Sequence, residues 1–190
     1  HMTNFGAYQS GAGYIFNYAY LLTGKAKYKN ACISYAESAL KIYDSKGVGP
    51  WLEGGHHIYN DDGMGISILC AYQLTGNKKY LKACQDVCDY FAVNDCSKGG
   101  HAGLCCIANF MIETEKAGGT KRYQKAIKNL LKLVLDKQVK HKNNLFNGGF
   151  SGEDEVPDWY VKGSKSKDYV VTRTTAYAVL ALFNAEGLVW

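Results

Sequence analysis

The stretch that decides the fold is Leu22-Thr23-Gly24, followed by Tyr28 and then by Ala31-Cys32. The same residues recur 52 positions later, as Leu74-Thr75-Gly76, Tyr80 and Ala83-Cys84. A third copy keeps the frame a further 43 positions along, with Gly119, Tyr123 and Ala126. A repeat of this period is typical of an array of supersecondary units.

Each copy predicts the tight elbow of an antiparallel helical hairpin. Glycine is favoured just past a helix, because it reaches positive φ without the steric cost of a Cβ atom. The tyrosine and alanine that follow would dock the next helix against the previous one. Apolar residues at helical spacing predict seven helices, over residues 13–22, 28–43, 62–75, 78–93, 102–116, 121–139 and 174–185. We therefore expect an all-α fold with three hairpins and the first helix of a fourth, whose elbow would start at Gly187.

The composition agrees with a single helical-hairpin repeat domain over residues 3–190. The chain has 15 tyrosines and only 2 prolines among 190 residues, which favours helices over a β-sandwich. His1-Met2 is typical of a cloning remnant. No apolar run approaches the roughly 20 residues of a membrane span, so we expect no membrane partner. The compartment stays open between the cytoplasm and secretion after removal of a signal.

Positive charge is concentrated in one segment of a chain whose net charge is +5. Residues 121–142 contain eight lysines or arginines and a single acid, Asp136. A solvated outer helix face explains this pattern, with an anionic partner as the alternative. Nucleic acid is the disfavoured partner, because no recognition motif accompanies the charge. Four of the lysines fall at helical spacing on one face: Lys121, Lys125, Lys128 and Lys132.

The chain has 7 cysteines, and an odd number argues against a complete set of intrachain disulfides. Most of them lie in apolar helical stretches, where cysteine behaves as a small buried hydrophobe. Cys84, Cys88, Cys96 and His101 could hold zinc, but no paired CxxC spacing supports such a site. We expect no metal and no cofactor.

The connections between hairpins are much longer than the elbows within them. They span residues 45–61, 94–101 and 140–173. If the hairpins stack side by side, these connections gather at one end of the stack and the elbows at the other. Because long loops in a compact domain are usually functional, the sequence predicts a binding face at the end with the connections.

The segment 59–83 resembles the α/α-toroid carbohydrate enzymes, which include the α-1,6-mannanases and the unsaturated glucuronyl hydrolases. These families often place an acidic pair before an inner helix, here Asp61-Asp62, and follow it with an elbow like that of residues 74–83. The resemblance implies glycoside hydrolysis. The loop Gly148-Gly149-Phe150 after Lys137-Gln138 instead resembles the repeats of prenyltransferases and terpene cyclases, which share the toroid architecture. Toroids close with more hairpins than the three and a half expected here, so we predict a partial toroid whose open edge can pair in a homodimer.

The candidate catalytic residues are Asp61, Asp62, His56 and His57. A glycosidase needs two carboxylates across the scissile bond, about 5 Å or about 6.5–9.5 Å apart. The resemblance implies that Asp61 or Asp62 is the general acid or the nucleophile, and the possible partners are Glu53, Asp154 and Asp158. Histidine titrates near neutral pH and could act as an acid or a base. The alternatives are that an aspartate caps the helix and that the histidines are solvated loop residues.

The candidate substrate-binding residues are aromatic and polar side chains of the connections and helix starts. Loop aromatics often pack locally, but several on one face would make a platform for a sugar ring. Arg173 could clamp a uronate bidentately, or it could neutralise Asp168. The acids at 153–155 and 158 match no EF-hand spacing, so solvated charge is preferred over calcium binding there. The full set is Trp51, Glu53, Tyr59, His101, Trp159, Tyr160 and Arg173.

The leading functional hypothesis is therefore a carbohydrate-active protein that hydrolyses a glycan in a cleft between the connections. The first alternative is a non-catalytic helical repeat that binds a glycan or a protein. The second is a prenyltransferase-like or cyclase-like array, which predicts a deep aromatic-lined cavity for an apolar ligand.

Overall fold

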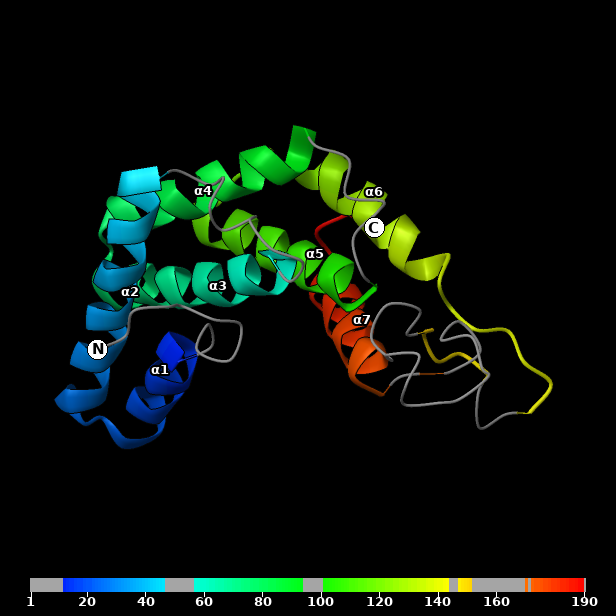
Figure 1. Cartoon of the computed structure of the whole chain (residues 1–190), viewed down its shortest axis with the longest axis horizontal. Helices are drawn as coiled ribbons and strands as arrows, with labels where there is room; N and C mark the ends of the chain where they lie inside the picture. The colour runs from blue at the N-terminus through cyan, green and yellow to red at the C-terminus, as the bar shows by residue number, and fades with distance from the viewer. Residues whose placement is uncertain are drawn as a thin grey trace. The chain divides into compact units, whose positions relative to one another are not determined.

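The computed structural model of the chain describes residues 12–46, 57–93, 101–143, 147–151, 170 and 172–189, without the side chains of 42–46, 57–64, 101–102 and 173. The predicted all-α class is confirmed, since these residues form seven helices and no strand (Figure 1). The helices are α1 (Ala12–Thr23), α2 (Ala26–Lys46), α3 (His57–Thr75), α4 (Lys78–Val93), α5 (His101–Gly118), α6 (Gln124–Leu135) and α7 (Thr172–Asn184).

The elbows at Gly24 and Gly76 have the same geometry, so the sequence repeat is also a structural repeat. Their φ angles are 65° and 67°, and each N–H donates to the carbonyl four residues earlier at 2.7 Å. The preceding threonine, Thr23 or Thr75, donates its hydroxyl to the carbonyl four residues back at 2.6 Å. A Cβ atom on either glycine would meet nothing within 4 Å. Glycine is thus required by conformation, because a left-handed residue with a Cβ costs about 1–2 kcal/mol.

The other two predicted elbow glycines also adopt positive φ, 62° at Gly119 and 74° at Gly187. At the third elbow, the N–H of Gly119 donates to Lys116 and that of Thr120 donates to Glu115. This pair of bonds is a Schellman motif, which ends a helix without the threonine of the first two copies.

Most predicted helix boundaries lie within three residues of the observed ones, but the start of the third helix and the end of the sixth differ by more. The third helix starts at His57 instead of near Asp62, so Asp61 and Asp62 lie in its second turn and neither is its N-cap. Local helix propensity is a weak guide when tertiary packing opposes it. The sixth helix covers only Gln124–Leu135, because the residues after it pair with a distant segment. Val139 donates its N–H to Gly149 at 2.7 Å and accepts that of Gly148 at 2.9 Å.

The described chain divides into two compact units, and the division falls within α5. One unit comprises His1–Val93 with Glu113–Thr120, and the other comprises Asn94–Ile112 with Lys121–Trp190. In the first unit, α1 contacts α3 and α2 contacts α4, in addition to the contacts within each hairpin. The two hairpins therefore stack in the same sense. The C-terminus of α2 and the N-terminus of α3 lie at the end opposite the two elbows.

The helices of the first unit approach closely at Gly13. A Cβ atom on this glycine would lie 2.6 Å from the Cβ atom of Ser67 and 3.0 Å from Tyr35. Only a residue without a side chain allows α1 to pack this tightly on α3. The core of this unit is formed by buried side chains of the other three helices, which include Cys32, Tyr35, Ala36, Ile68, Leu69, Cys84, Val87, Cys88 and Phe91.

In the second unit, α6 is amphipathic and contacts α7. Its apolar face is buried through Ile127, Leu130, Leu131 and Val134. Asn184 of α7 donates from its amide to Asn109 of α5 at 2.7 Å. Gln124 donates to the carbonyl of Leu188 at 2.7 Å. Side-chain amides thus tie α7 to α5, and the residues that follow α7 to α6.

Candidate functional site

The structure places some of the predicted site residues only by their position in a helix. Asp61, Asp62, His57 and Tyr59 belong to the first two turns of α3. His101 is the first residue of α5 and Arg173 the second of α7. Their side chains lie outside the described part of the chain. Trp51, Glu53, His56, Trp159 and Tyr160 lie outside the described residues altogether, so a shared cleft stays a prediction.

The N-terminal half of α3 has an unusual sequence for a helix. Asp61, Asp62 and Gly63 follow one another, and all three have low helix propensity. Two positions later, the carbonyl of the buried Gly65 accepts a hydrogen bond from the Cys84 thiol at 3.5 Å. Successive helix positions are about 100° apart around the axis, so the two aspartates occupy different faces of α3.

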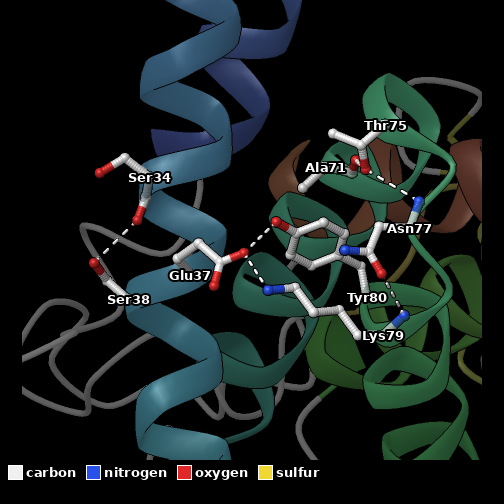
Figure 2. Close-up of polar contacts among 8 residues, drawn as sticks. All are labelled: Ser34, Glu37, Ser38, Ala71, Thr75, Asn77, Lys79 and Tyr80. Atoms are coloured by element: carbon white, nitrogen blue, oxygen red, sulfur yellow. Dashed lines mark hydrogen bonds and ion pairs between the residues drawn. The ribbon is translucent and has the colours of Figure 1, made fainter.

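A polar cluster in the first unit joins the two hairpins (Figure 2). Tyr80 donates its hydroxyl to Oε1 of Glu37, and Lys79 Nζ lies 2.6 Å from the same oxygen. Tyr80 is the elbow tyrosine of the second hairpin and is 2% exposed. This contact docks α4 on α2 of the other hairpin, whereas the sequence predicted that the tyrosine docks α4 on the preceding helix, α3. Glu37 was not among the residues that the sequence singled out.

The charges in this cluster suit a structural clamp. Hydrogen bonds from Lys79 and Tyr80 hold the pKa of Glu37 below its ordinary value. Burial, followed by the bond to Glu37, raises the pKa of Tyr80 well above its ordinary range. At neutral pH Glu37 is an anion and Tyr80 is protonated. A catalytic proton donor would need the opposite shift at its carboxyl group, so we do not assign Glu37 to catalysis.

A shallow groove of about 260 Å³ runs beside this clamp between α2 and α4. Lys82 and Asp86 form an i,i+4 ion pair on its wall. The groove is smaller than a typical small-molecule pocket of about 300–1,000 Å³. It differs from the aromatic cavity that the cyclase-like alternative predicts, because its lining consists of Glu37, Leu40, Lys41, Lys79, Lys82, Ala83 and Asp86.

The cysteines of the described residues belong to the core. All six described cysteines are buried and free of disulfides. Burial raises the pKa of Cys32 to about 11 and that of Cys70 to about 12. Thiols with such a pKa stay protonated and inert at neutral pH. Within the described ranges, no three histidine, cysteine or acidic side chains are arranged to hold a metal ion.

The basic segment presents its lysines to solvent in the second unit. Lys125, Lys128 and Lys132 are exposed on α6, and Lys121 is exposed just before it. Ile127 and Leu131 are fully buried on the other side of the same helix. The arrangement is that of an outer helix face, and it leaves the chain with a positively charged surface.

Removal of the Tyr80 hydroxyl should loosen the contact between the hairpins. Tyr80→Phe is expected to lower the free energy of unfolding by about 1 kcal/mol, because a half-exposed carboxylate loses one donor. The measurement is urea denaturation followed by circular dichroism. Glu37→Gln should have a similar effect that depends on pH. The folded-state pKa of Glu37 is lowered, so its contribution is present above the ordinary pKa of 4.5 and lost as the pH falls through the folded-state value.

The wild type and Glu37→Gln should therefore converge in stability in acid. Ser38→Ala is the control on the same helix, because the exposed Ser38 hydroxyl bonds the carbonyl of Ser34 within α2 and lies outside the clamp. Equal stability of the wild type and Tyr80→Phe at pH 7 would show that the hydroxyl does not hold the hairpins together.

Among the described residues, no helix is both long and apolar enough to cross a membrane. Comparison with protein families, curated proteins and solved structures found no match to this chain. The seven described helices and the recurring glycine elbows define the chain as an all-α protein built of helical hairpin repeats.

Proposed function

We propose that this protein is a carbohydrate-active enzyme that hydrolyses a glycosidic bond, with Asp61 or Asp62 as its principal carboxylate. The observation that carries the proposal is the start of α3 at His57. It puts the acidic pair inside a helix, near the end of the first unit that lies opposite the elbows. A capping role, the main alternative for either acid, requires the residue that flanks the helix start.

The sequence at the start of α3 contains residues that disfavour a helix, which suggests that they are kept for function. Two aspartates and a glycine in a helix interior together cost about 2 kcal/mol relative to alanine. A fold retains such a conflict between local preference and global structure mainly at functional positions. Paired carboxylates are the groups that glycoside hydrolysis uses.

The proposed chemistry assigns different roles to the neighbouring residues. One carboxyl group protonates the glycosidic oxygen, and a second carboxylate attacks the sugar or activates water. Glu53 is the partner carboxylate closest in sequence to the acidic pair. His56 and His57 would shuttle protons or bind hydroxyl groups, and Trp51 with Tyr59 would stack on the sugar ring.

The exposed lysines favour a second candidate function. Lys121, Lys125, Lys128 and Lys132 would suit an anionic ligand, such as a uronate-containing glycan. In this reading the chain is a binding module without catalysis.

A saccharide panel separates the two candidates. We expect incubation with neutral and uronate-containing oligosaccharides to release new reducing ends from at least one member. A binding module would instead give a rise in Tm without product, equivalent to about 2.7 kcal/mol of stabilisation at a ligand concentration 100 times Kd. The panel is read by reducing-end assay and by thermal shift. Neither product nor a shift with any saccharide would overturn both candidates.

A further inference from the structure

The residues that join α1 to α3 can be described by their distance in sequence from the elbow glycine that ends each helix. On α1, Gly13 and Asn17 lie 11 and 7 residues before Gly24, and both are buried. On α3, Ser67 and Cys70 lie 9 and 6 residues before Gly76, and they are 0% and 4% exposed. Gly13 abuts Ser67, and the Asn17 side chain lies near enough to Cys70 to lower the pKa of that thiol, against the larger effect of burial.

The first helix of a hairpin therefore has two contact faces. We call the positions 11 and 7 residues before the elbow glycine the rear face, which packs on the following hairpin. The positions 9 and 6 residues before it are the front face, which packs on the preceding hairpin. In α3, both faces are buried, with Gly65 and Leu69 on the rear face.

The two end helices obey the same rule with one face uncovered. On α1, the front-face residues Ile15 and Tyr18 are 65% and 51% exposed. On α7, counted from Gly187, the front-face residues Ala178 and Ala181 are fully buried. Its rear-face residues are Ala176, which is exposed, and Leu180, which is 45% exposed. Exposure thus falls on the front of the first helix and on the rear of the last.

Each uncovered face is enlarged by neighbouring apolar side chains. The front face of α1 is flanked by Tyr14, Leu21 and Leu22, and the rings of Tyr14 and Tyr18 already pack edge to face at 4.8 Å. The rear face of α7 is flanked by Val179 and Phe183. These two helices carry nine of the eleven large hydrophobic side chains that are exposed in the described residues. Clusters of this kind mark interaction surfaces.

We propose that the front face of α1 in one copy of the chain packs against the rear face of α7 in a second copy. The contact would keep the register of the α1–α3 pairing, with Ile15 beside Ala176 and Tyr18 beside Leu180. The two helices would lie further apart than α1 and α3 do, because Ile15 and Ala176 are bulkier than Ser67 and Gly13. A second copy is favoured as the partner because each chain has one uncovered front face, on α1, and one uncovered rear face, on α7. The contact between α1 and α3 already shows a rear face packed on a front face. None of the four face residues Ile15, Tyr18, Ala176 and Leu180 is charged, which favours an apolar partner.

The proposed association is head to tail, because the observed pairing joins a front face to a rear face and never two like faces. Such a heterologous contact uses different surfaces on the two copies. The use of different surfaces distinguishes this association from a symmetric dimer in experiments with single variants. The association does not depend on any hydrolytic activity.

The test uses two single variants and their mixture. Ile15→Glu spoils the front face and Leu180→Glu spoils the rear face, and each should weaken self-association at least ~100-fold by burying an unpaired charge. An equimolar mixture should form a one-to-one dimer that grows no further, since each variant keeps the face that the other has lost. The masses are measured by light scattering and sedimentation over a range of concentrations.

Val93→Glu is the matched control, because Val93 is 83% exposed on α4 and belongs to neither face. It should associate like the wild type, and circular dichroism should show all three variants folded. A wild type that is monomeric at every concentration would overturn the proposal. Variants that associate normally, or a mixture that stays monomeric, would overturn it as well.

Discussion

Asp62→Asn is expected to lower the rate of glycosidic hydrolysis by at least ~10³-fold, the upper part of the range for loss of a general acid–base group. Asparagine has nearly the shape of aspartate but carries no negative charge and no transferable proton. The free energy of unfolding should stay within about 0.5 kcal/mol of the wild type. Because α3 begins at His57, no N-cap is removed, and the usual capping loss of about 0.5–2 kcal/mol is not expected.

The measurement is the release of reducing ends under single-turnover conditions, together with urea denaturation of both proteins. Asp61→Asn is the companion variant, and Asp86→Asn on α4 is the matched control for a change of aspartate to asparagine elsewhere in the same unit. If both Asp61→Asn and Asp62→Asn keep full turnover of a substrate found in the panel, the acidic pair is not the catalytic centre. A saccharide panel that identifies no substrate would contradict the proposed hydrolysis itself, and this result is distinct from a wrong assignment of the catalytic residues.

The elbows were predictable because their requirement is local. A glycine at positive φ is determined by the backbone alone, and Gly24, Gly76 and Gly119 all adopt it. The helix from Lys78 to Val93 was predicted with its observed bounds. At its start, the Asn77 side chain accepts the N–H of Lys79 at 3.1 Å, an interaction that the residue type itself favours.

The misplaced end of the sixth helix has a non-local cause. Residues 137–139 were predicted to continue the sixth helix, but Val139 exchanges backbone bonds with Gly148 and Gly149, and the Lys137 carbonyl accepts the N–H of Ser151. Asp61 and Asp62 read as a helix start, while the structure continues α3 through them to His57. Periodicity and propensity describe neighbours along the chain, so they miss a segment whose partner lies ten residues away or on another helix.

The candidate site shows the same limit. The tyrosine at the second elbow was recognisable from the repeat, but its carboxylate partner was not, since Glu37 lies 43 residues away. Which acid faces that tyrosine depends on the register of α2 against α4. The acidic pair on α3 was found through a resemblance in sequence, and its separation from a second carboxylate is a three-dimensional quantity that no sequence pattern contains.

Gly13→Leu is expected to lower the free energy of unfolding by about 3 kcal/mol or more, at or beyond the upper end of the usual cost of overpacking. Even a Cβ atom at this position would lie 2.6 Å from the Cβ atom of Ser67, and leucine adds three further carbons. Alanine favours a helix over glycine by about 1 kcal/mol, so Gly13→Ala would be stabilising if there were room. We expect it to be destabilising. Urea denaturation of each variant provides the measurement.

A double-mutant cycle identifies the close approach of α1 and α3 as the cause. Ser67→Gly removes the atoms that the new side chain would meet, so Gly13→Ala combined with Ser67→Gly should be more stable than the sum of the two single changes predicts. Gly118→Ala is the control, because its nearest neighbour is the flexible end of Gln85 at 3.4 Å. Additive single effects, or a stabilising Gly13→Ala, would mean that α1 does not pack on α3 as closely as this contact requires. The front and rear faces would then lose the internal pairing on which the association of two copies is based.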